Sequence, residues 1–238
     1  MNAIPILMYH NIATPPAGAR LRGLYVRSNS FARQMRLLRL MGFQGLSMSA
    51  AMPYLRGEKK GRVAVITLDD GYVDALDNAL PALRANGFSA TCYFVSGRTG
   101  QTNDWDAAVL NVTKPLMTDA QLLQWHAAGM EVGAHSRTHP HLPNCSDSEL
   151  QSELAGSKSD LEKLIGEPVT QFCYPYGDYD ERVTQAVKQA GYAAVTTTNR
   201  GRANPGDDLM QLRRVLVTGS NMLHLFAIKV LSSYEDKR

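Results

Sequence analysis

The sequence predicts an α/β fold in which parallel strands are joined by helices and the strand count is close to that of a closed barrel. Short apolar runs alternate with longer segments whose apolar residues recur at helical spacing, a pattern typical of repeated strand–helix crossovers. The chain has 238 residues, of which 44% are hydrophobic, and single α/β barrels commonly reach about 250 residues. It contains no internal repeat and no long linker. We therefore expect one domain over residues 1–238.

Seven short apolar runs are the predicted strands. Runs of this kind, bounded by turn residues, are typical of strands, and seven is close to the count of a closed barrel. In chain order they are Ile4–Tyr9, Val63–Leu68, Ala90–Val95, Glu131–Ala134, Gln171–Tyr174, Ala193–Thr196 and Arg214–Val217.

Seven longer segments between or after these runs are the predicted helices: Phe31–Met41, Met48–Leu55, Ala75–Asn86, Asp119–Ala128, Ser148–Ile165, Glu181–Ala190 and Met222–Leu231. Ser30 can cap the first of them, and Ser146 with Glu149 forms the S-x-x-E capping-box pattern. Glycine, which favours the left-handed backbone at helix ends, stands at positions 42, 87, 129, 166 and 191.

Three long loops follow predicted strands: Ala13–Arg27, Gly97–Thr118 and Arg200–Leu209. In a parallel barrel, the loops after the carboxyl ends of the strands build the active site. The alternative is that each is an ordinary surface connection.

The charge balance argues against nucleic acid as the main partner. The chain has 25 Lys or Arg and 22 Asp or Glu, a formal charge of +3, whereas phosphate binding usually needs a concentrated basic face.

Cys92, Cys145 and Cys173 form no C-x-x-C pair, so neither a disulfide framework nor a cysteine zinc site is indicated.

The N-terminal residues show no signal-peptide pattern, and no stretch approaches the roughly 18 apolar residues of a membrane helix. As written, the chain is expected to be cytoplasmic, or periplasmic or extracellular if a signal was removed. The sequence does not indicate an oligomeric state.

Two adjacent acids, Asp69 and Asp70, follow the predicted strand Val63–Leu68 in the segment TLDDG. Two carboxylates in a partly dry site raise each other's pKa unless a cation neutralises them. The pair therefore indicates a metal site. The alternative is that one acid caps the next helix while Gly71 makes the turn.

Two histidines, His135 and His139, follow the predicted strand Glu131–Ala134 in HSRTH. Two histidines and one carboxylate form a recurring catalytic metal set with positions left open for water and substrate. Alone, H-x-x-x-H is often only a polar loop, but its combination with the acid pair is much more specific.

TLDDG, HSRTH and Tyr174–Gly177 (YPYG), in this order, resemble the signature motifs of the polysaccharide deacetylase family (NodB homology domain, carbohydrate esterase family 4). The resemblance extends from MYHNI to LRRVLV, almost the whole chain. It implies a distorted (β/α) barrel of about seven parallel strands that catalyses a hydrolysis.

The resemblance also implies the roles of four residues. Asp70, His135 and His139 would bind one divalent metal ion, and Asp69 would be the general base that takes a proton from water activated by the metal. The donor types favour zinc, although such a set also accepts cobalt, nickel or manganese.

The third motif is expected to contact the substrate. By the same resemblance, the main-chain N–H of Tyr176 would stabilise the oxyanion, with Pro175 and Gly177 setting the turn. Trp105 in the second long loop could stack on a sugar face or pack beneath that loop. His141 could be a rim residue or a solvated loop histidine.

The expected proton donor is His10, at the end of the first strand. Many family members supply this histidine near the C-terminus, where this chain has only His224, close to a predicted helix start and more consistent with packing. His10 in MYH resembles the branch of the family in which an N-terminal motif provides the acid.

A second departure is Cys173, which stands where many relatives have an arginine that orients the base. A neutral thiol cannot form that ion pair. Either another cation, Arg213 or Arg214, replaces the family arginine, or Asp69 is held differently. Cys173 itself is expected to be a small buried strand residue.

The predicted function is metal-dependent removal of N-acetyl groups from a polysaccharide or glycoconjugate that contains amino sugars. One alternative is an amidase acting on a small non-sugar amide or cyclic ureide. A second is a catalytically inert carbohydrate-binding module.

Overall fold

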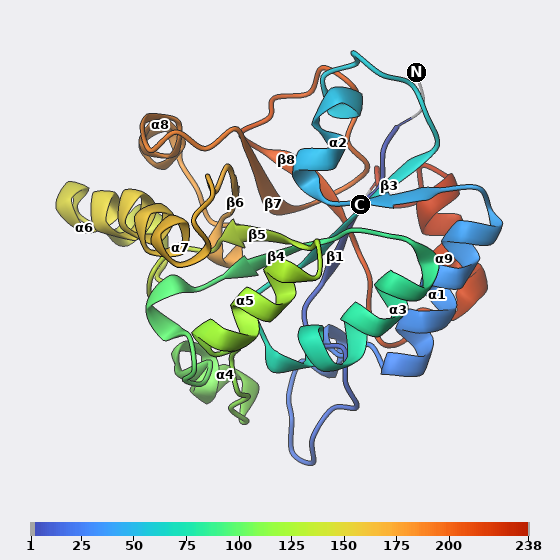
Figure 1. Cartoon of the computed structure of the whole chain (residues 1–238), viewed down its shortest axis with the longest axis horizontal. Helices are drawn as coiled ribbons and strands as arrows, with labels where there is room; N and C mark the ends of the chain where they lie inside the picture. Colours follow the sequence, from blue (N-terminus) through green and yellow to red (C-terminus); the bar gives the residue numbers. More distant parts are fainter. Residues whose placement is uncertain (1–2, 238) are drawn as a thin grey trace.

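Seven parallel strands close into a barrel in the computed structural model, which describes residues 3–237 (Figure 1). The strands follow one another in the order β1, β8, β7, β6, β5, β4, β3, and pairing of β3 with β1 closes the ring. Their bounds are β1 Ile6–Tyr9, β3 Val63–Leu68, β4 Thr91–Phe94, β5 Glu131–Ala134, β6 Gln171–Cys173, β7 Ala194–Arg200 and β8 Leu212–Leu216. All seven coincide with the predicted runs, which confirms the (β/α) barrel.

Three strand details differ from the prediction. β8 begins at Leu212, two residues before the predicted start at Arg214. β7 extends to Arg200 because its second half, TTNR, continues the pairing with polar residues that no apolar run reveals. An additional strand, β2 (Gln44–Leu46), pairs with the first half of β3. Its sequence QGL contains one large apolar side chain, too few to signal a strand.

Nine α-helices accompany the strands within residues 3–237, and none of them is both long and apolar enough to cross a bilayer. They are α1 Ser28–Leu40, α2 Met48–Leu55, α3 Leu80–Asn86, α4 Ala107–Leu110, α5 Asp119–Ala127, α6 Asp147–Gln151, α7 Ser157–Ile165, α8 Glu181–Gln189 and α9 Leu223–Leu231. Most lie around the outside of the barrel (Figure 1).

Helix boundaries follow the predicted punctuation except in four places. The predicted helix Ala75–Asn86 begins with a π-helical turn, Ala75–Ala79, before α3. The capping box of Ser146 and Glu149 is present, and the five predicted glycines all have positive φ. Ser30, however, lies inside α1, whose N-cap is Arg27. The predicted helix Ser148–Ile165 contains a π-helical turn between α6 and α7. The four-residue α4 lies in a segment expected to be loop.

Alternation along the strands separates two apolar layers. On β3, Ala64, Ile66 and Leu68 pack between the barrel and the outer helices, whereas Val63 and Val65 join the cluster that fills the barrel. Helix α2 belongs to this inner cluster and hydrogen-bonds to the first residues of β4 and β5. It therefore covers the N-terminal end of the barrel and leaves the C-terminal end for a site.

Candidate active site

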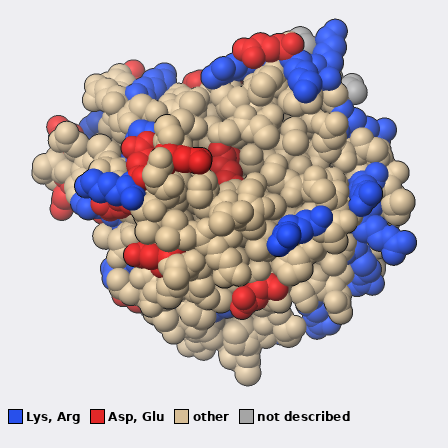
Figure 2. All heavy atoms as spheres, viewed as in Figure 1, with Lys and Arg blue, Asp and Glu red and all other residues tan. Residues whose placement is uncertain are grey.

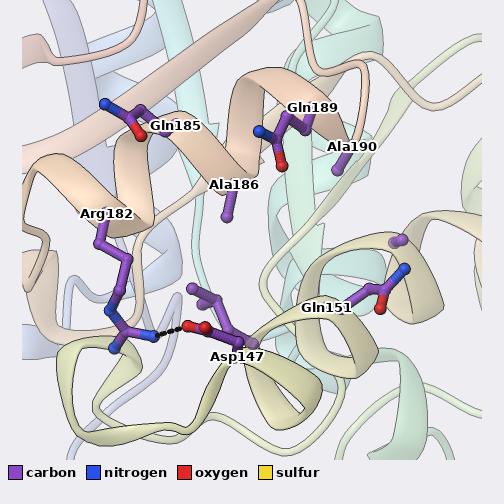
Figure 3. A pocket seen from close by; sticks show the side chains of 9 residues that line it. Asp147, Gln151, Arg182, Gln185, Ala186, Gln189 and Ala190 are labelled. Atoms are coloured by element: carbon purple, nitrogen blue, oxygen red, sulfur yellow. Dashed lines mark hydrogen bonds and ion pairs between the residues drawn. The ribbon is translucent and has the colours of Figure 1, made fainter.

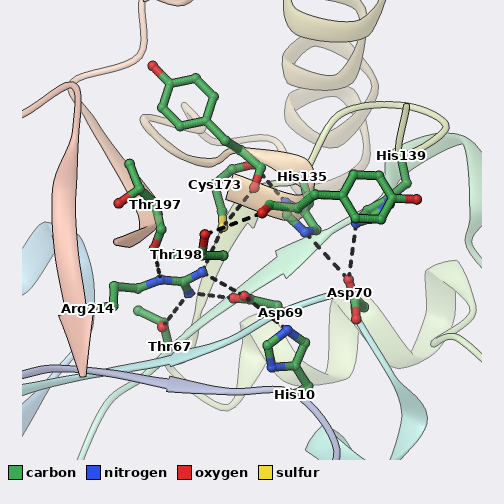
Figure 4. A network of polar contacts seen from close by, with 12 residues as sticks. His10, Thr67, Asp69, Asp70, His135, His139, Cys173, Thr197, Thr198 and Arg214 are labelled. Carbon is green, nitrogen blue, oxygen red and sulfur yellow. Dashed lines mark hydrogen bonds and ion pairs between the residues drawn. The ribbon is translucent and has the colours of Figure 1, made fainter. Parts of the chain in front are cut away.

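The inner face of the barrel becomes polar toward the C-terminal ends of the strands. The alternation that turns Val65 inward also turns Thr67 inward, and Asp69 is the next residue in that row. Arg214 of β8 is fully buried and donates to Thr67 Oγ1 at 3.0 Å. Figure 4 shows these side chains meeting beside His10 and Asp70.

Asp70, His135 and His139 converge on one point at this end of the barrel (Figure 4). Their ligand atoms all lie within 4.8 Å of one another. Oδ1 of Asp70 is 3.5 Å from Nε2 of His135 and 3.6 Å from Nε2 of His139. Two ligands that each bind tetrahedral zinc at about 2.0–2.1 Å lie about 3.4 Å apart. The three buried side chains therefore fit one shared divalent cation.

The orientation of His135 supports this fit. Its Nδ1 lies 2.7 Å from the carbonyl oxygen of Cys173, which can only accept a hydrogen bond, so Nδ1 carries a proton and Nε2 is the ring nitrogen that faces Asp70. Metal-binding histidines commonly donate their second ring N–H to a carbonyl or carboxylate in this way.

His139 is instead positioned by contacts with aromatic side chains. Trp105 stacks on it at 4.8 Å between ring centroids, and Tyr176 meets it edge-on at 4.5 Å. Burial and the neighbouring His135 lower the pKa of His139 to about 3, which keeps its imidazole neutral, the form that binds a metal.

The backbone at the cluster adopts left-handed conformations that non-glycine residues rarely have. The φ angles are 73° at Asp70, 64° at Ser136 and 64° at His139. Such conformations cost roughly 1–3 kcal/mol each and concentrate at functional sites. Here they occur in the two segments that follow β3 and β5 and that carry Asp70 and His139.

Asp69 is held by Arg214 rather than by a residue of the third motif. The guanidinium donates from Nη1 to Oδ1 at 2.7 Å and from Nη2 to Oδ2 at 2.8 Å. Burial alone would raise the pKa of Asp69, but Arg214 holds it below its ordinary value. Of the two arginines proposed to replace the family arginine at Cys173, Arg214 is therefore the partner, and Arg213 lies beside Gly201 instead.

His10 lies beside Asp69, on the side opposite Arg214 in Figure 4. Its Nε2 is 3.7 Å from Oδ2 of Asp69, and 19% of its side chain is exposed, so a substrate can reach it. His224 is exposed on α9 and does not line the pocket, and its predicted packing role is therefore wrong.

The turn after β6 carries Tyr176 with φ 59° and Gly177 with φ 78°. A Cβ on Gly177 would lie 2.0 Å from Oγ1 of Thr198, so only glycine fits there. Tyr176 reaches the pocket and donates its hydroxyl to Asp106 Oδ1 at 3.3 Å. Pro175, the first residue of the turn, is buried and is not among the residues that line the pocket.

A pocket of about 620 Å³ surrounds these groups. The part of the pocket that contains the acid pair and the histidines is polar, and the wall opposite them is apolar. Seven of the predicted site residues line it: His10, Asp69, Asp70, Trp105, His135, His139 and Tyr176. The other lining residues are Met8, Leu21, Leu24, Tyr72, Asp106, Val109, Leu110, His141, Tyr174, Thr198, Arg200 and Leu216.

Two of the predicted active-site loops build the apolar wall. Leu21 and Leu24 come from Ala13–Arg27, and Val109 and Leu110 come from Gly97–Thr118. The loops support each other, since the main-chain N–H of Arg20 donates to the carbonyl of Leu110 at 2.9 Å. The third loop supplies only its first residue, Arg200.

Several pocket residues were missed or undervalued by the sequence analysis. His141 stacks on Tyr176 at 4.0 Å and pairs with Asp178 at 2.5 Å, so it is a rim residue. Tyr72 follows the acid pair by two positions, a signal that could have identified it. Asp106 gave no signal beyond its place next to Trp105.

A second hollow, of about 460 Å³, lies between α6 and α8 (Figure 3). Arg182 spans part of it and donates to Asp147 at 2.9 Å. The hollow contains no histidine and none of the metal-binding candidates, so the pocket at the end of the barrel is the candidate active site.

Comparisons with known proteins agree with this choice. A model of the polysaccharide deacetylase family matches residues 56–195. YxkH of Bacillus subtilis (strain 168), which carries a polysaccharide deacetylase name, is 30% identical over 217 residues that cover 90% of this chain and 71% of YxkH. The poly-beta-1,6-N-acetyl-D-glucosamine N-deacetylase of Escherichia coli (strain K12) is 22% identical over 268 residues, 98% of this chain and 39% of that protein.

Among solved structures, the Streptococcus pyogenes deacetylase PplD in complex with acetate superposes with a TM-score of 0.84 and 25% identity, over 96% of this chain and 98% of that chain. The region that the family model matches, residues 56–195, includes the acid pair and both histidines of the candidate metal cluster. This chain belongs to the polysaccharide deacetylase family of enzymes.

Proposed function

We propose that this enzyme removes N-acetyl groups from a polymer of amino sugars by metal-dependent hydrolysis. The observation that carries the proposal is the cluster of Asp70, His135 and His139 beside an ionised Asp69, at the floor of an open pocket. The E. coli relative named as an N-deacetylase of an N-acetylglucosamine polymer supports this class of substrate.

Asp70, His135 and His139 would hold the metal ion. Once bound, a divalent cation polarises the amide carbonyl and lowers the pKa of water. One carboxylate and two imidazoles favour zinc, and cobalt, nickel or manganese would also be accepted.

Asp69 is the proposed general base, accepting the proton of the attacking water. Because Arg214 occupies both of its oxygens, the carboxylate is ionised and fixed in one orientation. Asp69 lines the pocket, and His10 lies beside it there.

His10 is the proposed acid that protonates the departing amine, and the main-chain N–H of Tyr176 is the proposed oxyanion donor. His10 borders the pocket close to Asp69, so one region both takes and returns a proton. Trp105 and Pro175 stay predicted substrate contacts, Trp105 from the pocket wall and Pro175 through the turn it sets.

An N-acetylated glycan fits the pocket better than a small amide or ureide does. A small-molecule amidase would be expected to enclose its substrate, whereas Leu21 and Val109 on the rim are 56% and 55% exposed. An inert binding module would have no need for an ionised Asp69 aligned beside the metal ligands.

The test is acetate release from N-acetylglucosamine oligomers, measured with a chelator and after zinc is restored. We expect Asp69→Asn to bind zinc in calorimetry but lose turnover, and His135→Ala to lose both. Full activity of Asp69→Asn, or chelator-resistant turnover by zinc-free enzyme, would contradict the proposal. Turnover of small amides with inert oligomers would instead support the amidase.

A further inference from the structure

Exposed apolar side chains gather in two places on the described part of the chain. Leu21 and Val109 stand on the pocket rim, and Leu123 stands apart on α5. The other large hydrophobic residues that are more than a third exposed belong to α1, α9 and the residue before α9: Leu40, Met222, Leu223, Ile228 and Leu231. Single exposed leucines are ordinary, but a gathered set marks an interaction surface.

Helix α1 lies between α3 and α9 and packs against both, so the exposed sides of α1 and α9 belong to one outer surface. Arg36, Arg39 and Leu40 lie on the side of α1 next to α3, where Nη1 of Arg39 donates to the carbonyl of Ala85 at 3.2 Å. A hollow of about 370 Å³ between α1 and α9 is lined by Arg33 of α1 and by Met222 and Leu223. On α9, Ile228 and Leu231 are three positions apart and so lie on one side of the helix. We call the exposed side chains of Arg33, Arg36, Arg39, Leu40, Met222, Leu223, Ile228 and Leu231 the α1–α9 face.

The α1–α9 face carries only positive charge. Residues 27–40 contain four arginines and no Asp or Glu, and residues 217–232 contain no Asp or Glu. Arg33, Arg36 and Arg39 are exposed, and none of the ion pairs formed within residues 3–237 includes them. Figure 2 shows Lys and Arg side chains down the right side of the molecule, where Figure 1 places α1 and α9.

The elements packed against α1 change this charge little. Helix α3 adds the exposed Arg84, and the π-helical turn Ala75–Ala79 adds one exposed acid, Asp77. Lys229 of α9 is buried and paired with Glu235. The surface therefore combines exposed apolar side chains with a row of three arginines along α1. Arg33 lies on the α9 side of this row and Arg36 and Arg39 on the α3 side, and none of the three has an acidic partner within residues 3–237.

We propose that the α1–α9 face docks this protein on the surface of an anionic lipid bilayer. Arginines match phosphate headgroups, while protruding Leu, Ile and Met side chains fit the boundary between headgroups and acyl chains. A second copy fits poorly, because a twofold interface would set the arginine row against itself. This inference does not depend on the proposed function.

The face adjoins the active-site pocket. Met222 and Leu223 follow β8 at the open end of the barrel, and the main-chain N–H of Gly219 donates to the carbonyl of Gly23 at 3.1 Å. Gly23 belongs to the loop that carries Leu21 and Leu24 to the pocket rim. A docked molecule would hold this rim next to the bilayer.

Sedimentation of the full chain with lipid vesicles tests the proposal. We expect binding to vesicles of phosphatidylcholine and phosphatidylserine, release by high salt, and no binding to phosphatidylcholine alone. The variant Arg33→Gln/Arg36→Gln/Arg39→Gln should bind on the order of a hundredfold more weakly, since each arginine near an anionic leaflet contributes about fivefold. Ile228→Ser/Leu231→Ser should also weaken binding. Circular dichroism reports whether each variant is folded.

A matched control removes the same charge elsewhere. Arg56, Lys59 and Lys60 are exposed in the connection between α2 and β3, at the closed end of the barrel, and their triple change to Gln should leave binding unchanged. Equal losses in both triple variants would overturn the proposal, as would failure of the wild type to bind anionic vesicles. A wild-type dimer that Ile228→Ser/Leu231→Ser converts to monomers would assign the face to a second copy and also overturn it.

Discussion

Arg214 is a charged side chain with no solvent exposure, yet each of its N–H groups has an acceptor. Nε donates to the carbonyl of Thr197, Nη1 to Thr67 and Asp69, and Nη2 to Asp69 and the sulfur of Cys173. Guanidinium has five donors, and five acceptors surround it. Cys173, which stands where many relatives have an arginine, thus accepts one of the hydrogen bonds that hold Arg214 in place.

Replacing Arg214 with Lys should reduce turnover ten- to hundredfold, because an ammonium group cannot hold both oxygens of Asp69 in one plane. The free energy of unfolding should also fall, since part of this buried network loses its partners. Steady-state acetate release and urea unfolding measure the two effects. Arg213→Lys is the neighbouring control, and equal kinetics in both variants would remove Arg214 as the residue that positions the base.

His10→Ala should slow amide hydrolysis by roughly 10²- to 10⁴-fold, the usual contribution of a general acid. Zinc binding measured by calorimetry should change little, because His10 is outside the metal cluster. Turnover of 4-nitrophenyl acetate should be largely retained, since nitrophenolate leaves without a proton. If amide and activated ester slow equally, His10 has a role other than proton donation.

Sequence reasoning found the candidate-site side chains that stand in contiguous motifs at strand ends, because parallel strands bring those ends together. It could not choose between Arg213 and Arg214, since that choice depends on which side of β8 faces the barrel. It missed β2 and the polar end of β7, where backbone pairing continues without apolar side chains. Asp106 reaches the pocket through the path of a long loop, which no local pattern encodes.

Among the elements of the site, the turn Pro175–Gly177 shows how backbone geometry places a functional group. Tyr176 and Gly177 both have positive φ, and the carbonyl of Tyr176 accepts a hydrogen bond from Thr198 on β7 at 3.3 Å. The proposed oxyanion donor is therefore positioned by contact between two neighbouring strands and not by its own side chain.

Gly177→Ala should lower kcat strongly, because the new Cβ would collide with Thr198 and displace the turn. Gly166 is a matched control: its φ is 73°, but a Cβ there meets nothing within 4 Å. Gly166→Ala should cost about 1 kcal/mol of stability and leave kcat unchanged. The proposed role of the turn would fail if Gly177→Ala kept the wild-type kcat.

For the molecule as a whole, ion pairs tie the segment that follows α9 to the barrel. Glu235 is buried between Arg200 of β7 and Lys229 of α9, with N–O distances of 2.7 and 2.9 Å, and Asp236 pairs with Arg202 at 2.8 Å. Arg200 also lines the pocket. The last turn of the chain thus supports one wall of the active site.

Acid should loosen this attachment. Burial alone would raise the pKa of Glu235, but Arg200 and Lys229 hold it below its ordinary value of 4.5. A carboxyl whose pKa falls on folding stabilises the folded state above its unfolded-chain pKa, and that stability is lost as pH falls through the folded-state pKa. The wild type should therefore exceed Glu235→Gln in unfolding free energy at neutral pH, and the difference should shrink below about pH 4.5. Urea unfolding at several pH values measures this difference, and Glu58→Gln, at an exposed position, is the control. A difference between wild type and Glu235→Gln that does not change with pH would refute the prediction.

The pairing of β1 with β3 sets Tyr9 opposite Leu68, and the main-chain N–H of Asp69 donates to the carbonyl of Tyr9 at 3.0 Å. Tyr9 and Leu68 form the last residue pair of β1 and β3, so His10 and Asp69 are the first residues after the two strands and start from the same level of the barrel. The spacing between the proposed proton donor and the proposed proton acceptor is consequently set by the main-chain pairing of β1 with β3. The proposed reaction would therefore depend on the closure of the barrel as directly as on either side chain.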